Sequence, residues 1–160
     1  MRFFIYIAVM LKSIKKFSEL EKTEKKLFVE AYVVLGLTRL ALLTMSFKRI
    51  VAALEHHQYP VELLALSEKD CLIAQTIGRA IQRAANHTLW DSACLAQALT
   101  AQRMLQKRRI PGVFYLGVIK NNSWKEKMKA HAWSQCGNSV ITGGKGHEKF
   151  TIMSVFGWSK

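Results

Sequence analysis

The chain has 160 residues, of which 50% are hydrophobic and 22% charged, and only two are prolines. This composition excludes a disordered chain, and the length suits one domain with a core of its own. The formal net charge is +13, from 24 Lys and Arg against 11 Asp and Glu. Such a balance favours nucleic acid, an anionic membrane surface or an acidic protein as partner. Because the sequence has no zinc-finger spacing and no aromatic RNA-binding strand, we expect a solvated basic surface and no nucleic-acid site.

The three cysteines, Cys71, Cys94 and Cys136, are an odd number at wide spacing, and no Cys-x-x-Cys pair occurs. This usage argues against a disulfide scaffold and against a structural zinc site. We therefore expect reduced thiols, a cytoplasmic location, no metal and no cofactor.

Two apolar stretches raise the question of a membrane. The run Phe3–Leu11 is followed by lysines, but it is too short to span a bilayer and lacks the layout of a signal peptide. Contact of this N-terminal run with a membrane surface stays open. The stretch Leu27–Phe47 is long enough to span, yet it contains Glu30 and Arg39, so we expect a buried helix instead.

The N-terminal half reads as helical. Ser18 to Glu21 has the spacing of a capping box and predicts a helix to about Ser46, loosened at Gly36. One stripe of this helix is predicted to face the core, namely Leu27, Ala31, Val34, Thr38 and Ala41. Residues 55–65 read as a loop with a short helix. A second capping box, Ser67 with Asp70, predicts a helix that ends near residues 86–87.

A third helix is predicted from Asp91 or Ser92, either a good N-cap, to Arg109, where Pro111 and Gly112 stop it. After this helix the sequence becomes rich in residues that favour β-strands, and strands are expected at residues 113–119, 131–136, 139–142 and 150–156. A hairpin turn is predicted at residues 137–138. The sequence therefore predicts an α+β fold, with a helical region over residues 1–66 and the core over residues 67–160, together one compact unit.

Cys94 and His131 are the residues that suggest chemistry. Cys94 lies at the predicted start of a helix, where unpaired N–H groups and the helix dipole favour a thiolate. His131 follows 131 − 94 = 37 residues later in a predicted strand, from which an imidazole can act as base. A structural cysteine and a core histidine are the alternative interpretation. Cys71 and Cys136 lack such placement and are interpreted as structural.

The predicted hairpin suggests a third group. With residues 137–138 as the turn, Cys136 pairs with Ser139 and Trp133 pairs with Thr142. Thr142 then lies diagonal to His131 on the same face, where a hydroxyl can orient the imidazole. We therefore take Thr142 as the predicted third member of the site.

A series of short motifs carries a resemblance to a known family. In chain order they are WDSACLAQAL (90–99), MLQKRRIP (104–111), FYLGV (114–118), AHAW (130–133), Cys136-Gly137, Thr142-Gly143-Gly144 and FTIMSVF (150–156). Together they resemble the leader peptidases of lasso peptide biosynthesis, within the transglutaminase-like superfamily. The likeness covers about residues 88–157, and the segments Glu21–Ala31 and Arg39–Arg49 resemble that family's helical N-terminal part.

The resemblance implies a papain/transglutaminase-like core, with a nucleophile helix packed on a small antiparallel sheet. It implies a cysteine protease that removes the leader from a ribosomally made precursor peptide, with Cys94 as nucleophile and His131 as base. Some members carry an Asp in the strand after the His hairpin, but residues 140–143 contain none. Thr142, a backbone carbonyl or Glu148 then remain as groups that orient His131.

The resemblance also implies partners: a precursor peptide, a leader-binding recognition-element protein, and a cyclase that closes the macrolactam on the freed amine. Three other functions stay open. A transglutaminase-type acyltransferase would use the same Cys and His, a peptide-binding module would use neither, and a basic membrane or nucleic-acid binder would depend steeply on salt.

Overall fold

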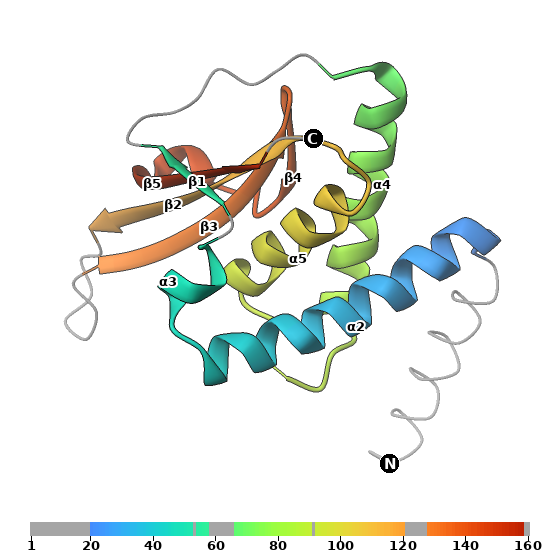
Figure 1. Cartoon of the computed structure of the whole chain (residues 1–160), viewed down its shortest axis with the longest axis horizontal. Helices are drawn as coiled ribbons and strands as arrows, with labels where there is room; N and C mark the ends of the chain where they lie inside the picture. Colours follow the sequence, from blue (N-terminus) through green and yellow to red (C-terminus); the bar gives the residue numbers. More distant parts are fainter. Residues whose placement is uncertain (1–19, 53, 58–65, 91, 121–127, 159–160) are drawn as a thin grey trace, which may run out of the picture.

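Three long helices lie on one side of a five-stranded sheet (Figure 1). The computed structural model describes residues 20–52, 54–57, 66–90, 92–120 and 128–158. The helices are α2 (Lys22–Thr44), α4 (Glu68–Ala85) and α5 (Cys94–Gln106). Helix α5 packs on the sheet, and α2 crosses both α4 and α5. The arrangement confirms the predicted α+β class, with helices first and an antiparallel sheet after them.

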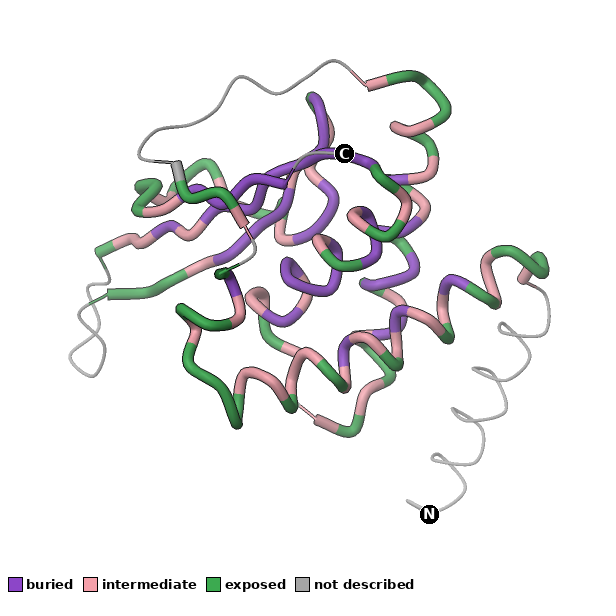
Figure 2. Tube along the Cα trace, viewed as in Figure 1, coloured by how far each residue is buried: buried purple, intermediate pink, exposed green. Residues whose placement is uncertain are grey.

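Helix α2 is one unbroken helix, but only one of its faces is buried (Figure 2). Its buried residues are Leu27, Ala31 and Leu35, so the predicted stripe holds for its first two positions and then shifts to Leu35. The helix runs through Gly36 without a break, in contrast to the predicted loosening there. The N-cap is Glu21, without a side-chain hydrogen bond, and Ser18 lies outside the described residues.

Helix α4 follows the prediction closely. The Ser67 hydroxyl accepts a hydrogen bond from the Asp70 backbone N–H at 3.1 Å, which confirms the predicted N-cap. Ile77, Ile81 and Ala84 are buried along one face. This regular stripe forms because the apolar residues recur with the helical period.

The segment between α2 and α4 differs from the prediction of a loop. It contains the short helix α3 (Phe47–Ile50) and the strand β1 (Glu55–His57), which pairs antiparallel with β5. The aromatic ring of Phe156 packs against the rings of Phe47 and His56, with ring centroids 5.7 Å and 5.0 Å apart, respectively. These distant contacts explain the strand, since nothing in residues 55–57 alone favours one. Residues 58–65, where a short helix was expected, lie outside the described residues.

The other strands are β2 (Gly112–Lys120), β3 (Met128–Cys136), β4 (Ser139–Thr142) and β5 (Thr151–Trp158), and the sheet order is β1-β5-β2-β3-β4. All pairings are antiparallel. The short 3-10 helix η1 (His147–Lys149) connects β4 and β5. Strand β3 begins three residues before its predicted start. The predicted turn after Cys136 is confirmed, with Gly137 at φ 50°.

The pleat of the sheet separates two clusters of buried side chains. Phe114 and Ala132 belong to the main core with the three long helices. Tyr115 and Trp133 form a second cluster, with their rings stacked at 5.2 Å. Because neighbouring residues of a strand point to opposite faces, the two clusters lie on the two sides of β2 and β3. The main core contains residues from both sides of the predicted boundary at residue 66.

An ion pair fixes α2 to the end of α5. The Arg108 guanidinium donates to both carboxylate oxygens of Glu30, at 2.6 and 3.2 Å, and Lys107 Nζ lies 3.0 Å from Oε1. The hydrogen bond from Arg108 is the largest cause that lowers the pKa of Glu30, and burial opposes it. Two-point contacts of this kind are stronger than single surface ion pairs.

Replacing Glu30 should therefore change stability in a pH-dependent way. We expect Glu30→Gln to lower the free energy of unfolding by about 1–2 kcal/mol at neutral pH. A lowered folded-state pKa stabilises above the unfolded pKa, and this contribution is lost as the pH falls through the folded pKa. The difference between the variant and the wild type should thus shrink in acid, as measured by urea unfolding. Glu24→Gln, which removes a 3.8 Å pair with Arg83, is the control and should change stability by less than about 0.5 kcal/mol.

Candidate functional site

Cys94 is the first residue of α5. A cap at Ser92 would have made it the second residue of the helix. The N-cap is Ala93, which makes no side-chain cap hydrogen bond. Ser92 does not cap because its hydroxyl bonds Thr88 Oγ1 at 2.8 Å, and its carbonyl accepts from the Gln97 side chain at 2.7 Å. Asp91, the other predicted cap, lies outside the described residues. The thiol of Cys94 thus belongs to the first turn, where the helix dipole is positive.

The three thiols have different surroundings. Cys94 is half-buried and packs against the main core between the helices and the sheet. Cys136 is fully buried, and burial raises its pKa to about 12, with a smaller effect from the neighbouring Cys71. Cys136 is therefore a neutral thiol near pH 7, which fits a structural residue. Of the two remaining cysteines, only Cys94 lies at a helix start, since Cys71 is inside α4.

His131 lies in β3 opposite Gly117, and its ring has a defined partner. Nε2 is 2.7 Å from the carbonyl oxygen of Gly143. A carbonyl only accepts, so Nε2 must carry the proton, and in the neutral ring the lone pair is then on Nδ1. The ring of Phe150 packs against the imidazole at 5.0 Å, and that of Trp133 at 6.0 Å. The contacts select the tautomer that a general base requires, with Nδ1 as the basic atom.

Gly143 orients His131 through its backbone because a side chain has no room there. Its φ is +71°, a conformation that L residues rarely adopt. A Cβ would lie 2.4 Å from the carbonyl oxygen of Ala132 and 2.9 Å from the Cβ of Trp133. The imidazole of His131 therefore meets a neutral backbone carbonyl and not a carboxylate.

The predicted place of Thr142 is wrong. Thr142 pairs with Ser134, not with Trp133, because the register shifts between Ser134 and Gln135. The pairing of Cys136 with Ser139 is confirmed. The Thr142 hydroxyl lies 2.7 Å from the Ser134 hydroxyl, and both residues are buried. A shift by one position turns a side chain to the other face, so Thr142 does not meet His131.

Glu148 does not contact His131 either. It is exposed, and its carboxylate lies 3.4 Å from Nδ1 of His147, which also contacts the Gly144 carbonyl oxygen at 2.6 Å. Of the three groups that the sequence left as candidates, the structure places the backbone carbonyl against His131.

Thr142→Val should accordingly act on stability rather than on catalysis. The substitution keeps the shape but leaves the buried Ser134 hydroxyl without its partner, at a cost of about 1–3 kcal/mol. We expect a lower midpoint in urea unfolding and, in the folded fraction, an unchanged turnover rate. Restoration of stability in the double variant Thr142→Val, Ser134→Ala would identify the unpaired hydroxyl as the cause. A fall in turnover without loss of stability would return Thr142 to the site.

Cys94 and His131 come from neighbouring elements, since α5 packs along β3. No hydrogen bond between the thiol and the imidazole occurs among the described residues. His131 shares its face of β3 with Trp133, whereas Ala132 points to the helices and Cys94 packs on that side. The structure thus supplies a helix-start thiol and an oriented imidazole, on the two sides of one strand.

Sequence reasoning missed Gly143 and Phe150 as partners of His131. The pair Gly143-Gly144 was the available signal, because glycines after a strand often allow close backbone approach. In the part of the chain that the structure describes, no group of three or more His, Cys, Asp or Glu side chains is placed to hold a metal ion.

Comparison with known proteins gives one finding. The family model described as the transglutaminase-like superfamily matches residues 34–155, which include Cys94, His131 and the whole described sheet except β5's last three residues. Searches of curated proteins and of solved structures found no match. The superfamily includes cysteine proteases and acyltransferases. Because the match covers more than half of its length, this chain belongs to the transglutaminase-like superfamily.

Proposed function

We propose that the protein is a cysteine protease that removes the leader from a ribosomally made lasso precursor peptide. The observation that carries the catalytic part is the hydrogen bond from His131 Nε2 to the Gly143 carbonyl, which leaves Nδ1 as the base. Cys94, at the start of a 13-residue helix, is the matching nucleophile. The leader-peptidase part rests on the motifs from WDSACLAQAL to FTIMSVF, beyond the superfamily itself.

The proposed chemistry is acyl transfer to water. The Cys94 thiol gives its proton to Nδ1 of His131, and the thiolate attacks the carbonyl carbon before the core peptide. His131 then protonates the leaving amine as the C–N bond breaks, and the leader stays as a thioester. Water, deprotonated by His131, attacks the thioester and releases the leader acid and the Cys94 thiol. Backbone N–H groups at the start of α5 are suited to stabilise the oxyanion.

This sequence of steps requires the thiol and Nδ1 within hydrogen-bonding reach, directly or through one water. The described residues do not show that contact. Catalytic hydrogen bonds are often long in free enzymes and tighten in the complex with substrate. Because the thiol and the imidazole lie on the two sides of β3, the proposal also requires a rearrangement that brings Nδ1 of His131 to the α5 side of the strand when the peptide binds.

The proposed partners follow from the same resemblance. A separate recognition-element protein presents the leader, and a cyclase uses the freed core amine to form the macrolactam. The basic chain, at +13, suits an acidic leader or an acidic partner. Capture of the leader raises the effective concentration of the scissile bond, so the partner should accelerate cleavage.

Mass spectrometry of a precursor peptide incubated with the protein tests the proposal. Hydrolysis adds the mass of water across the two products, whereas an acyltransferase joins the leader to an added amine instead. The assay is run with and without a leader-binding recognition-element protein. Cleavage between leader and core supports the proposal, and an intact precursor in both assays contradicts it.

A non-catalytic peptide-binding module is the second candidate. Two observations favour it: no hydrogen bond joins Cys94 and His131 in the described residues, and a glycine carbonyl stands where a carboxylate would stabilise an imidazolium. Alkylation by iodoacetamide at neutral pH separates the candidates. A nucleophilic Cys94 reacts well before Cys71 and Cys136, and a merely packed Cys94 does not.

A further inference from the structure

The outer face of α2 carries a continuous apolar stripe that the described part of the fold leaves uncovered. We call the outer stripe its five exposed side chains, Val29, Val33, Leu37, Leu40 and Leu43. Each has between 53 and 68% of its surface exposed. The six other exposed large hydrophobic residues among the described ones follow no such line, since they are spread over three other elements and two loops. A contiguous exposed stripe of this kind marks an interaction surface.

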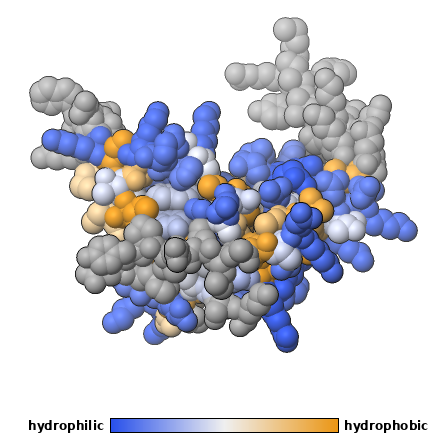
Figure 3. Space-filling model, turned by 90° about the horizontal axis from the view of Figure 1, so that it is seen from above, coloured by the Kyte–Doolittle hydropathy of each residue, from blue (hydrophilic) through white to orange (hydrophobic). Residues whose placement is uncertain are grey.

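The stripe lies directly opposite the buried face of the same helix. At about 100° per residue, the outer stripe centres about 180° away from Leu27, Ala31 and Leu35. It extends over about 21 Å, from residue 29 to residue 43. Helix α2 therefore uses one face for the core and presents the other to its surroundings. By contrast, the face seen in Figure 3 is mostly hydrophilic, with only scattered hydrophobic residues in its described part.

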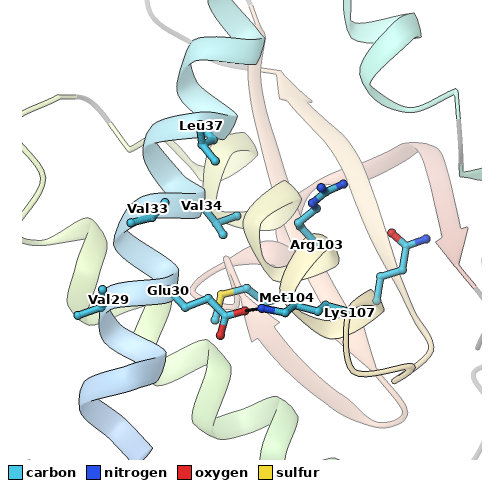
Figure 4. A pocket seen from close by; sticks show the side chains of 9 residues that line it. Val29, Glu30, Val33, Val34, Leu37, Arg103, Met104 and Lys107 are labelled. Atoms are coloured by element: carbon cyan, nitrogen blue, oxygen red, sulfur yellow. Dashed lines mark hydrogen bonds and ion pairs between the residues drawn. The ribbon is translucent and has the colours of Figure 1, made fainter.

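Positive charge lies at one end and along one side of the outer stripe. Lys22 and Lys26 are exposed and continue its line at the N-terminal end of α2. On the side towards α5, a groove of about 700 Å³ lies beside Val29, Val33 and Leu37, and Arg103 and Lys107 form its far wall (Figure 4). The one carboxylate in the groove, Glu30, is neutralised by its ion pairs with Lys107 and Arg108.

The helix is suited to lie on a membrane rather than to cross it. By length and composition, α2 is the one described helix that qualifies as a membrane span, with a mean hydropathy of 1.7. Crossing would remove Leu27, Ala31 and Leu35 from the main core and break the bond of Glu30 to Arg108. Lying in the interface keeps both and buries the outer stripe among lipid chains, with lysines at phosphate level.

The composition of the surface favours lipid over another protein. The outer stripe is entirely Val and Leu and contains no Trp, Tyr or Arg, the residues that dominate the energetics of protein interfaces. A second copy of this chain is disfavoured because two chains of +13 repel each other. Anionic lipid fits both the apolar stripe and the positive charge, since its acyl chains cover the stripe and its headgroups pair with the cations.

From these observations we infer that the outer stripe of α2 docks this protein on an anionic membrane surface. Docking leaves the helical core in place and turns the α2 face to the lipid. The inference uses only α2 and α5 and is independent of the catalytic proposal.

Co-sedimentation of the full chain with vesicles tests the inference. One set contains phosphatidylglycerol mixed into phosphatidylcholine, and the other contains phosphatidylcholine alone. The test variant is Leu37→Gln with Leu40→Gln, and Leu72→Gln is the matched control. Leu72 is 60% exposed on α4 and Leu37 is 61% exposed on α2, so the control matches one of the two substitutions of the test variant in side chain and in exposure. Circular dichroism verifies that all three proteins remain folded.

We expect the wild type and Leu72→Gln to bind the anionic vesicles, less so at high salt, and neither to bind phosphatidylcholine appreciably. The double variant should bind about tenfold more weakly. Equal binding of all three proteins would overturn the inference, because another part of the chain would then hold the lipid. Absence of binding by the wild type would overturn it too. The inference would also be overturned if the wild type formed a dimer without lipid and the double variant did not. It would likewise be overturned if binding by the wild type depended on an added protein and the double variant abolished that dependence.

Discussion

Cys94→Ala is expected to abolish leader cleavage while the fold persists. The variant removes the nucleophile of the acyl-transfer step, so turnover should fall by at least about 10³-fold. His131→Ala should give a loss of similar size, because the thiol then lacks its base and the leaving amine lacks its acid. Residues that act as one unit are not additive, so the double variant should be no worse than either single one. The measurement is the initial rate of leader release by mass spectrometry, with the recognition-element protein present.

Cys71→Ala is the matched control, since Cys71 is also half-buried and also lies in a helix. It should cleave at nearly the wild-type rate. Circular dichroism and urea midpoints of the three variants separate a lost catalyst from a lost fold. If folded Cys94→Ala still cleaves at the wild-type rate, the nucleophile is misassigned. If folded His131→Ala still cleaves at the wild-type rate, His131 is not the base, and its hydrogen bond to Gly143 has no role in catalysis.

Gly143→Ala is expected to cost both stability and turnover. The positive φ strains any L residue by about 1–2 kcal/mol, and the new methyl collides with the Ala132 carbonyl, 2.4 Å away. Relief of that collision moves the backbone and adds about 1–3 kcal/mol. Together the substitution should lower the midpoint of thermal unfolding by about 5–15 °C. The moved carbonyl no longer holds Nε2 of His131, so turnover falls in the fraction that remains folded.

Gly146→Ala isolates the steric part of this effect. Gly146 has almost the same backbone conformation, with φ +74° against +71° at Gly143, but a Cβ there meets nothing within 4 Å. The control should therefore show only the conformational strain and keep its turnover. Two equally destabilised variants would show that the contact with Ala132 is unimportant. Full turnover in folded Gly143→Ala would show that the carbonyl does not orient the base.

The sequence by itself determined the helices and hairpin whose signals are local. The Ser67 cap with Asp70 began α4 where predicted, and α5 ended ahead of Pro111, though at Gln106 rather than at the predicted Arg109. The turn at residues 137–138 was found the same way. Each of these signals acts between residues a few positions apart, so periodicity and capping chemistry suffice to read it. Cys94 and His131 also came from the sequence, through the motifs around them.

Only the tertiary structure decided the features that depend on distant partners. Strand β1 exists because β5 offers an edge to pair with, and residues 55–57 do not encode that. The group that contacts His131 depends on one shift of register between Ser134 and Gln135, which places Thr142 on the opposite face of the sheet. The Gly143 carbonyl lies beside His131 instead. Hydrophobic periodicity likewise predicted a buried stripe on α2. The exposed stripe on the opposite face is apparent only in the structure, where α4 and α5 cover a single face of the helix. The physical reason is common to all three: pairing and burial are set by residues far away in the chain, whose positions no local pattern contains.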